Sequence, residues 1–131
     1  MIGLDTNILV RASGSPGGPA MRLLETIRRE HTLVLSAFIV DELNRVLRYP
    51  RIQARYHLTA TYAEAFGARV AAAALMVDPS AIRPPISPDP ADDPILYTAA
   101  AGQADILCTL NTRHFAGPEA QAFCAQHGIR A

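Results

Sequence analysis

Acidic residues stand at three points of the sequence where carboxylate chemistry is possible. Asp5 ends an apolar run at residues 1–4, Glu42 lies in a stretch of helical periodicity, and Asp93 closes a cluster that also holds Asp89 and Asp92. Carboxylates without a nearby group of histidines or cysteines suit Mg²⁺ or Mn²⁺ rather than zinc. Such an ion activates water and stabilises a leaving oxygen, so the chemistry that these residues permit is metal-assisted phosphodiester hydrolysis.

Two of these carboxylates have a simpler alternative as helix caps. Asp5 alone fits a turn or a cap, and Asp93, which directly precedes Pro94, is typical of a helix N-cap. A cap does not explain Asp92, and like charges this close repel one another unless a cation is present. The cluster therefore favours metal binding, with Asp92 competing with Asp93 for the ligand position.

Helical geometry separates Glu42 from its neighbour Asp41. At 100° per residue, Glu42 lies on the flank of the apolar face that contains Leu43, whereas Asp41 points away from that face. An unpaired carboxylate at the edge of a core is costly. We therefore expect Glu42 to have a partner, either an arginine or a metal ion, and Asp41 to be a solvated surface charge.

Apolar strands that alternate with amphipathic helices must position these side chains. Strands are predicted at residues 1–4, 31–35 and 105–109. Helices are predicted at 7–12, 19–30, 37–48 (with Ser36 as its cap), 51–57, 60–76, 94–102 and 118–127, and proline-rich 78–94 is predicted to be a loop.

This alternation predicts an α/β fold, a three-layer α/β/α sandwich around a parallel sheet of four to five strands. Ligands of such sheets bind beyond the carboxyl ends of the strands. Asp5 and Ser36 fall at two of these ends, and Asn111 follows a third. The fold is therefore expected to bring these three positions to one crevice.

Length and composition indicate one domain over residues 1–131. The formal net charge is zero, so a nucleic acid would be gripped locally rather than by bulk charge. The apolar run at 71–77 is too short to cross a bilayer, and residues 1–5 lack the features of a signal peptide. We expect a protein of the cytoplasm that does not enter membranes.

Four segments, in order, resemble motifs of the PIN-domain family, and in particular of VapC-type toxins. They are 2–9 (IGLDTNIL), 36–43 (SAFIVDEL), 89–96 (DPADDPIL) with 102–107 (GQADIL), and 108–115 (CTLNTRHF). The resemblance implies that Asp5, Glu42 and Asp93 are metal ligands. It also implies that Asn7 assists them and that Ser36 orients the site. Asn111 stands where many relatives carry a fourth aspartate, so a second metal depends on Asp92, Asp89 or the RNA phosphate.

The function that this resemblance implies is RNA cleavage with Mg²⁺ or Mn²⁺ by the toxin of a toxin–antitoxin pair. Its expected partners are RNA, a small antitoxin protein and a second copy of the chain. Arg11 and Arg113 lie nearest the expected crevice and are the candidates to bind phosphate. An open alternative is a PIN-like module that binds RNA or a partner but cleaves weakly or not at all.

Overall fold

The computed structural model describes residues 1–79 and 93–131, apart from the side chain of His114. Within these residues four parallel strands form one sheet in the order β3 (Leu75–Val77), β2 (Leu33–Ser36), β1 (Ile2–Leu4) and β4 (Ile106–Cys108). β1 pairs with β2 through Ile2 and Leu33, and with β4 through Ile2 and Ile106. The predicted α/β class and parallel sheet are confirmed.

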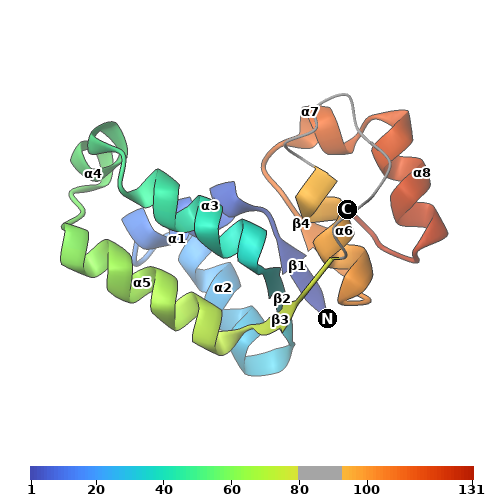
Figure 1. Cartoon of the computed structure of the whole chain (residues 1–131), viewed down its shortest axis with the longest axis horizontal. Coiled ribbons are helices and arrows are strands. Elements are labelled where there is room, and N and C mark those ends of the chain that lie inside the picture. The colour runs from blue at the N-terminus through green and yellow to red at the C-terminus, as the bar shows by residue number, and fades with distance from the viewer. Residues whose placement is uncertain (80–92) are drawn as a thin grey trace.

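Helices cover both faces of the sheet (Figure 1). Those that the structure describes are α1 (Thr6–Gly14), α2 (Pro19–Glu30), α3 (Ala37–Leu47), α4 (Pro50–Tyr56), α5 (Ala60–Ala73), α6 (Asp93–Ala101), α7 (Thr112–Phe115) and α8 (Pro118–Gln126). On one side α3 packs against β2 and α5, and on the other α6 packs against β1, β2 and α8. The result is the expected three-layer arrangement.

The segment after α5 differs from its prediction. A helix was expected to run through residue 76, but α5 ends at Ala73 and Leu75–Val77 forms β3. Ala74 leaves the helix with an extended backbone, and Leu75 then pairs with Val34 of β2. This pairing is a long-range interaction that overrides local helix propensity. The predicted loop at 78–94 falls mostly on residues 80–92, which lie outside the described part of the chain.

Two smaller differences concern helix ends. Helix α1 continues through Ser13 and Gly14, beyond the predicted end at residue 12, and the short helix α7 was not predicted. Thr59 caps α5 as expected for a threonine at a helix start, because its side chain accepts a hydrogen bond from the Tyr62 N–H at 3.1 Å.

Gly102, just after α6, lies against the sheet with no room for a side chain. A Cβ at this position would overlap Cγ1 of Val34 and lie 3.2 Å from its Cβ. Val34 is fully buried in the interior strand β2, so it cannot swing aside. Gly102→Ala is therefore expected to lower the free energy of unfolding by about 1–3 kcal/mol, the usual effect of overpacking, as measured by urea denaturation.

Gly17→Ala is the matched control for this substitution, because a Cβ at Gly17 meets nothing within 4 Å. Its effect is expected to stay within about 0.5 kcal/mol. Equal denaturation midpoints for Gly102→Ala and the wild type would contradict the close packing of Gly102 on β2.

Candidate active site

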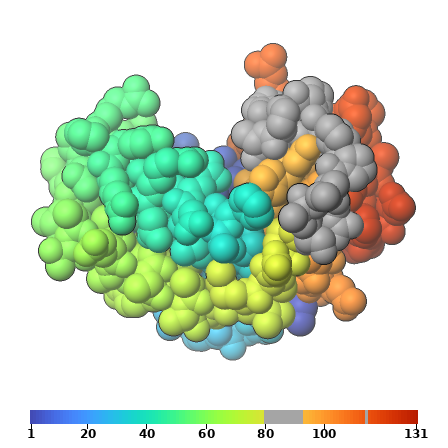
Figure 2. Space-filling model, in the orientation of Figure 1, coloured from blue at the N-terminus to red at the C-terminus, as the bar shows by residue number. Residues whose placement is uncertain are grey.

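A cleft of about 320 Å³ lies beyond the carboxyl end of β1. Figure 2 shows a notch in the surface between α3 and α6, and both helices contribute residues to the cleft. The lining residues come from five segments that are distant in sequence: Asp5, Thr6, Asn7, Val10, Arg11, Glu42, Val46, Tyr56, Ile95 and Asn111. The fold thus brings two of the predicted carboxylates, Asp5 and Glu42, to one cleft.

Asp5 is held at the junction of β1, β4 and α1. Its backbone N–H donates to the Cys108 carbonyl at 2.9 Å, and its side chain is only 5% exposed. The Thr109 hydroxyl donates to Oδ2 of Asp5 at 2.7 Å, and that hydroxyl in turn accepts from the Asn111 N–H at 2.9 Å. The Thr109 hydroxyl thus orients the Asp5 carboxylate from the residue that directly follows the neighbouring strand β4.

Helix capping does not account for Asp5. Asp5 is the N-cap residue of α1 by its extended backbone, but its side chain makes no capping hydrogen bond. A carboxylate next to the first turn of a helix is nevertheless stabilised by the helix dipole. Asp5 is therefore the N-cap residue of α1 without a capping hydrogen bond from its side chain, and its role as a metal ligand stays a prediction.

Glu42 lies half-buried on α3, as its helical position predicts, and Asp41 is exposed. Glu42 was expected to pair with an arginine or a metal ion. Among the described residues its partner is the Thr6 hydroxyl, which donates to Oε2 at 2.8 Å. Asp5 and Glu42 thus each accept a hydrogen bond from a threonine hydroxyl. Neither threonine was predicted to orient a carboxylate.

Asn7 supplies an acceptor that lacks a protein partner in the described part of the chain. Its Oδ1 is buried and receives no hydrogen bond there. Buried polar atoms are nearly always satisfied, so one without a partner needs an explanation such as an ion or a water molecule. Asn7 lines the cleft, and the amide oxygen suits the same hard cations as the carboxylates.

The side chains around the cleft fit Mg²⁺ or Mn²⁺ better than zinc. Oxygen atoms are offered by Asp5, Asn7, Glu42 and Asn111, and no histidine or cysteine is among the described residues that line the cleft. Oxygen ligands are those that hard divalent cations prefer. Burial raises the pKa of the nearby Cys108 thiol, which keeps that group protonated near neutral pH.

Asp93 is less closely tied to the cleft than the other two carboxylates. It begins α6, and Ile95, two residues later, lines the cleft, but Asp93 is not among the lining residues. Over residues 1–79 and 93–131, no three Asp, Glu, His or Cys side chains form a group that could hold a metal ion. Asp93 therefore stays a predicted third ligand, and Asp89 and Asp92 lie outside the described residues.

Ser36 connects the sheet to α6. It is the N-cap residue of α3, but its side chain makes no capping bond. Its buried hydroxyl lies 2.7 Å from that of Thr98, which donates to the Pro94 carbonyl at 2.6 Å. Ser36 does not line the cleft. Its side chain instead bonds to Thr98 of α6, whose hydroxyl also bonds to the Pro94 carbonyl in the first turn of that helix.

The predicted phosphate ligands lie in different places. Arg11 is exposed and lines the cleft, whereas Arg113 is exposed on α7 and is not among the lining residues. The side chain of His114 lies outside the described part. The residue that sequence reasoning overlooked is Thr109, and the available signal was its place at the end of a predicted strand, two residues before Asn111.

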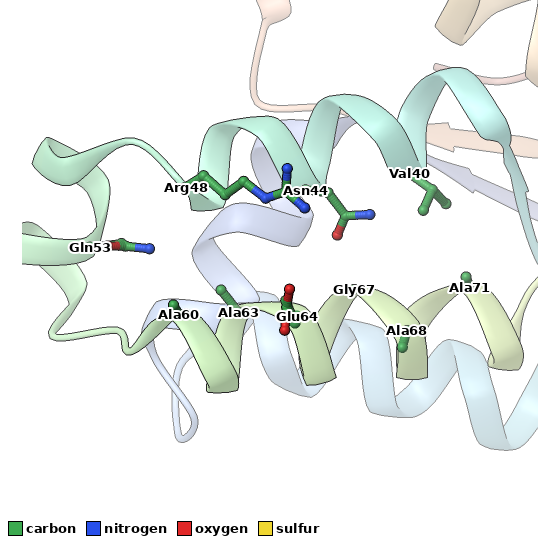
Figure 3. A pocket seen from close by; sticks show the side chains of 10 residues that line it. All are labelled: Val40, Asn44, Arg48, Gln53, Ala60, Ala63, Glu64, Gly67, Ala68 and Ala71. Carbon is green, nitrogen blue, oxygen red and sulfur yellow. The ribbon is translucent and has the colours of Figure 1, made fainter.

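A second hollow, of about 450 Å³, lies between α3 and α5 (Figure 3). Asn44 projects from α3 toward Gly67 of α5, where a Cβ would overlap its Oδ1. Much of the wall is alanine, and Glu64 is the single carboxylate among the lining residues. One carboxylate is too few for the chemistry that the sequence predicts, so this hollow is not the candidate active site.

Comparisons with known proteins bear on the fold and the family of this chain. A family model described as "PIN domain" matches residues 2–113. A chain in the crystal structure of VapBC2 from Rickettsia felis, bound to a DNA fragment from their promoter, superposes with a TM-score of 0.60. The two chains are 20% identical over 86% of this chain and 90% of that chain, a level at which the likeness shows the fold. No curated protein sequence matches.

Proposed function

This chain belongs to the PIN-domain family, and on that basis we propose that it is a Mg²⁺- or Mn²⁺-dependent endoribonuclease. The observation that carries the proposal is the pairing of Asp5 and Glu42 in one cleft, with each carboxylate oriented by a threonine hydroxyl. Two carboxylates that line the same cleft repel each other if they lie close together, and a divalent cation bound to both would remove that repulsion.

The residues have distinct roles in this proposal. Asp5, Glu42 and Asp93 would hold the ion, and Asn7 and Asn111 offer neutral oxygens beside it. A bound Mg²⁺ or Mn²⁺ supplies an activated water and charge neutralisation for the phosphate. Arg11, at the edge of the cleft, would bind a phosphate oxygen and fix the direction of the RNA, while Arg113 would act farther along the strand.

Chelation of the metal ion and substitution of Glu42 test the proposal. The purified chain is expected to cleave RNA in Mn²⁺ and to lose this activity in EDTA. Glu42→Gln is expected to lower the rate about 100-fold, because it removes charge stabilisation from the transition state. Asp41→Asn is the matched control. The Asp41 carboxylate is next to Glu42 in the sequence but is exposed, so its removal should leave the cleavage rate nearly unchanged. Equal trace activity in the wild type, Glu42→Gln and Asp41→Asn would contradict the nuclease proposal.

One observation favours the alternative, a binding module that cleaves weakly or not at all. Asn111 lines the cleft at the position where an aspartate would add negative charge, so the site has fewer charges with which to hold a second ion. Binding of the same RNA in a separate binding measurement, without Mn²⁺-dependent cleavage in the assay above, would establish this alternative.

Thr109 provides a test of how Asp5 is positioned. Thr109→Val removes the donor to Asp5 and leaves the Asn111 N–H without its acceptor. We expect a loss of about 10- to 100-fold in Mn²⁺ affinity or activity, the usual effect of losing a group that orients a metal ligand. Thr109→Ser keeps the hydroxyl and should restore most of the loss. Equal defects in both variants would indicate a packing role only.

The wider setting is also a proposal: a toxin of the VapC type, held inactive by a small antitoxin and acting as a homodimer in the cytoplasm, with residues 1–131 as one domain. Its support is the fold shared with a chain of a VapBC2 complex. In the part of the chain that the structure describes, no helix is long and apolar enough to span a membrane. Copurification with the product of a neighbouring reading frame would test for the antitoxin.

A further inference from the structure

Two buried hydroxyl groups meet where α6 packs against the end of β2. Ser36 ends β2 and is the N-cap residue of α3, Thr98 belongs to α6, and each is at most 1% exposed. Their hydroxyl oxygens lie 2.7 Å apart, and the Thr98 oxygen also lies 2.6 Å from the Pro94 carbonyl oxygen. A hydroxyl has one proton to donate, so Thr98 donates to Pro94 and accepts from Ser36. Two hydrogen bonds in series thus connect the start of α3 to the first turn of α6.

The hydroxyl of Thr98 is unusual on its face of α6. The other buried residues of this helix are apolar: Ile95, Leu96 and Ala99. A branched side chain such as threonine is also restricted within a helix, so helix propensity does not favour it. A buried hydrogen bond adds little net stability, but it specifies the distance and direction between two elements, which apolar contacts do less sharply. Thr98 therefore contributes to the placement of α6 more than to its stability.

The two helices that this pair joins both contribute to the cleft. Glu42 and Val46 line it from α3, and Ile95 lines it from α6. Asp93, the predicted third ligand, begins α6 and directly precedes Pro94. An ion held from both helices needs a fixed distance between them, because Mg²⁺ demands nearly ideal octahedral geometry with ligands at about 2.0–2.1 Å. A small shift of α6 relative to α3 is therefore enough to weaken binding.

Building on the proposed metal-dependent function, we infer that Thr98 is a positioning residue for the metal site. Its bonds to Ser36 and to the Pro94 carbonyl set the distance between the start of α3 and the start of α6. The first of these helices carries Glu42, and the second begins with Asp93. Thr98 is not among the residues that line the cleft, so it acts only through the placement of the two helices.

The experiment measures Mn²⁺ binding to the full chain without RNA, from the electron paramagnetic resonance signal of the free ion. Thr98→Val keeps the shape of the side chain and removes its hydroxyl. It is expected to raise the Mn²⁺ dissociation constant about 10-fold, the usual effect of losing a group that orients metal ligands. Thr98→Ser keeps the hydroxyl and should bind Mn²⁺ nearly as tightly as the wild type.

Two further variants separate placement from stability. Val70→Ala removes buried atoms from α5, a helix that contributes no residue to the cleft. It should lower the urea midpoint and leave the Mn²⁺ dissociation constant unchanged. The double variant Ser36→Ala/Thr98→Val has no buried hydroxyl left without a partner at this place, so its urea midpoint should return close to the wild-type value. Its affinity for Mn²⁺ should stay low, because the bond between the two helices is absent.

Equal Mn²⁺ dissociation constants for the wild type and Thr98→Val would overturn the inference and leave the metal site of the nuclease proposal intact. Equal defects in Thr98→Val and Thr98→Ser, an equal loss of affinity in Val70→Ala, or recovered affinity in the double variant would also overturn it. Packing or stability alone would then explain Thr98. A wild-type chain that binds no Mn²⁺ would reject the metal site itself, and the role of Thr98 with it.

Discussion

Asp5→Asn is expected to lower Mn²⁺-dependent RNA cleavage about 1,000-fold, the upper end of the usual cost of removing one charge-stabilising group. The reason is geometric. Asp5 is the most buried of the three carboxylates, and its position is fixed by hydrogen bonds from Thr109 to its side chain and from its backbone to Cys108. Asparagine keeps the shape and can still accept from Thr109, but it removes the negative charge. Single-turnover cleavage at saturating RNA measures the effect.

Asp78→Asn is the matched control for this substitution, since Asp78 is exposed and does not line the cleft. Both variants are expected to unfold at the same urea concentration as the wild type within error, so that the loss reports chemistry rather than folding. If Asp5→Asn cleaves as fast as Asp78→Asn, Asp5 holds no catalytic ion.

Leu43→Ala is expected to destabilise the protein by about 2–5 kcal/mol. Leu43 is completely buried at the centre of α3, the helix that carries Glu42, and it belongs to the main hydrophobic core. Removal of its side chain costs the transfer free energy of the lost atoms and leaves a cavity, because neighbouring elements relax only in part. Urea denaturation at fixed temperature measures the change.

Leu110→Ala makes the same chemical change at a leucine that is 47% exposed in the loop after β4, and its effect should stay within about 0.5 kcal/mol. The comparison therefore isolates burial as the cause. A loss below about 1 kcal/mol for Leu43→Ala would show that α3 is packed loosely, and the rigid placement of Glu42 would then lose its basis.

Local patterns were enough to predict much of the fold. The apolar run before Asp5 predicted β1, and Pro19 marked the start of α2 where the structure has it. β3 could not be predicted this way, because Leu75–Val77 continues an alanine-rich helical stretch without a breaking residue. Only its pairing with β2, 41 residues earlier in the sequence, makes it a strand.

The candidate site, like the fold, could be predicted from local patterns only in part. Helical spacing distinguished Glu42 from Asp41, and the end of β1 marked Asp5, because both signals are local. The threonines that bond to these carboxylates come from other elements of the fold: Thr109 directly follows the neighbouring strand β4, and Thr6 begins another helix, α1. Such contacts depend on tertiary packing, so single-sequence periodicity does not reveal them. Asp93 remains a prediction from its sequence context.

The most direct test of the proposed site is the location of a bound metal. Crystals of the full chain soaked in Mn²⁺ would give an anomalous difference map in which the ion is identified by its own scattering. We predict one strong peak in the cleft, about 2.0–2.2 Å from carboxylate oxygens of Asp5 and Glu42, with Asp93 as the third ligand. A cleft without a peak at saturating Mn²⁺, with Glu42 still bonded only to Thr6, would contradict the proposed site.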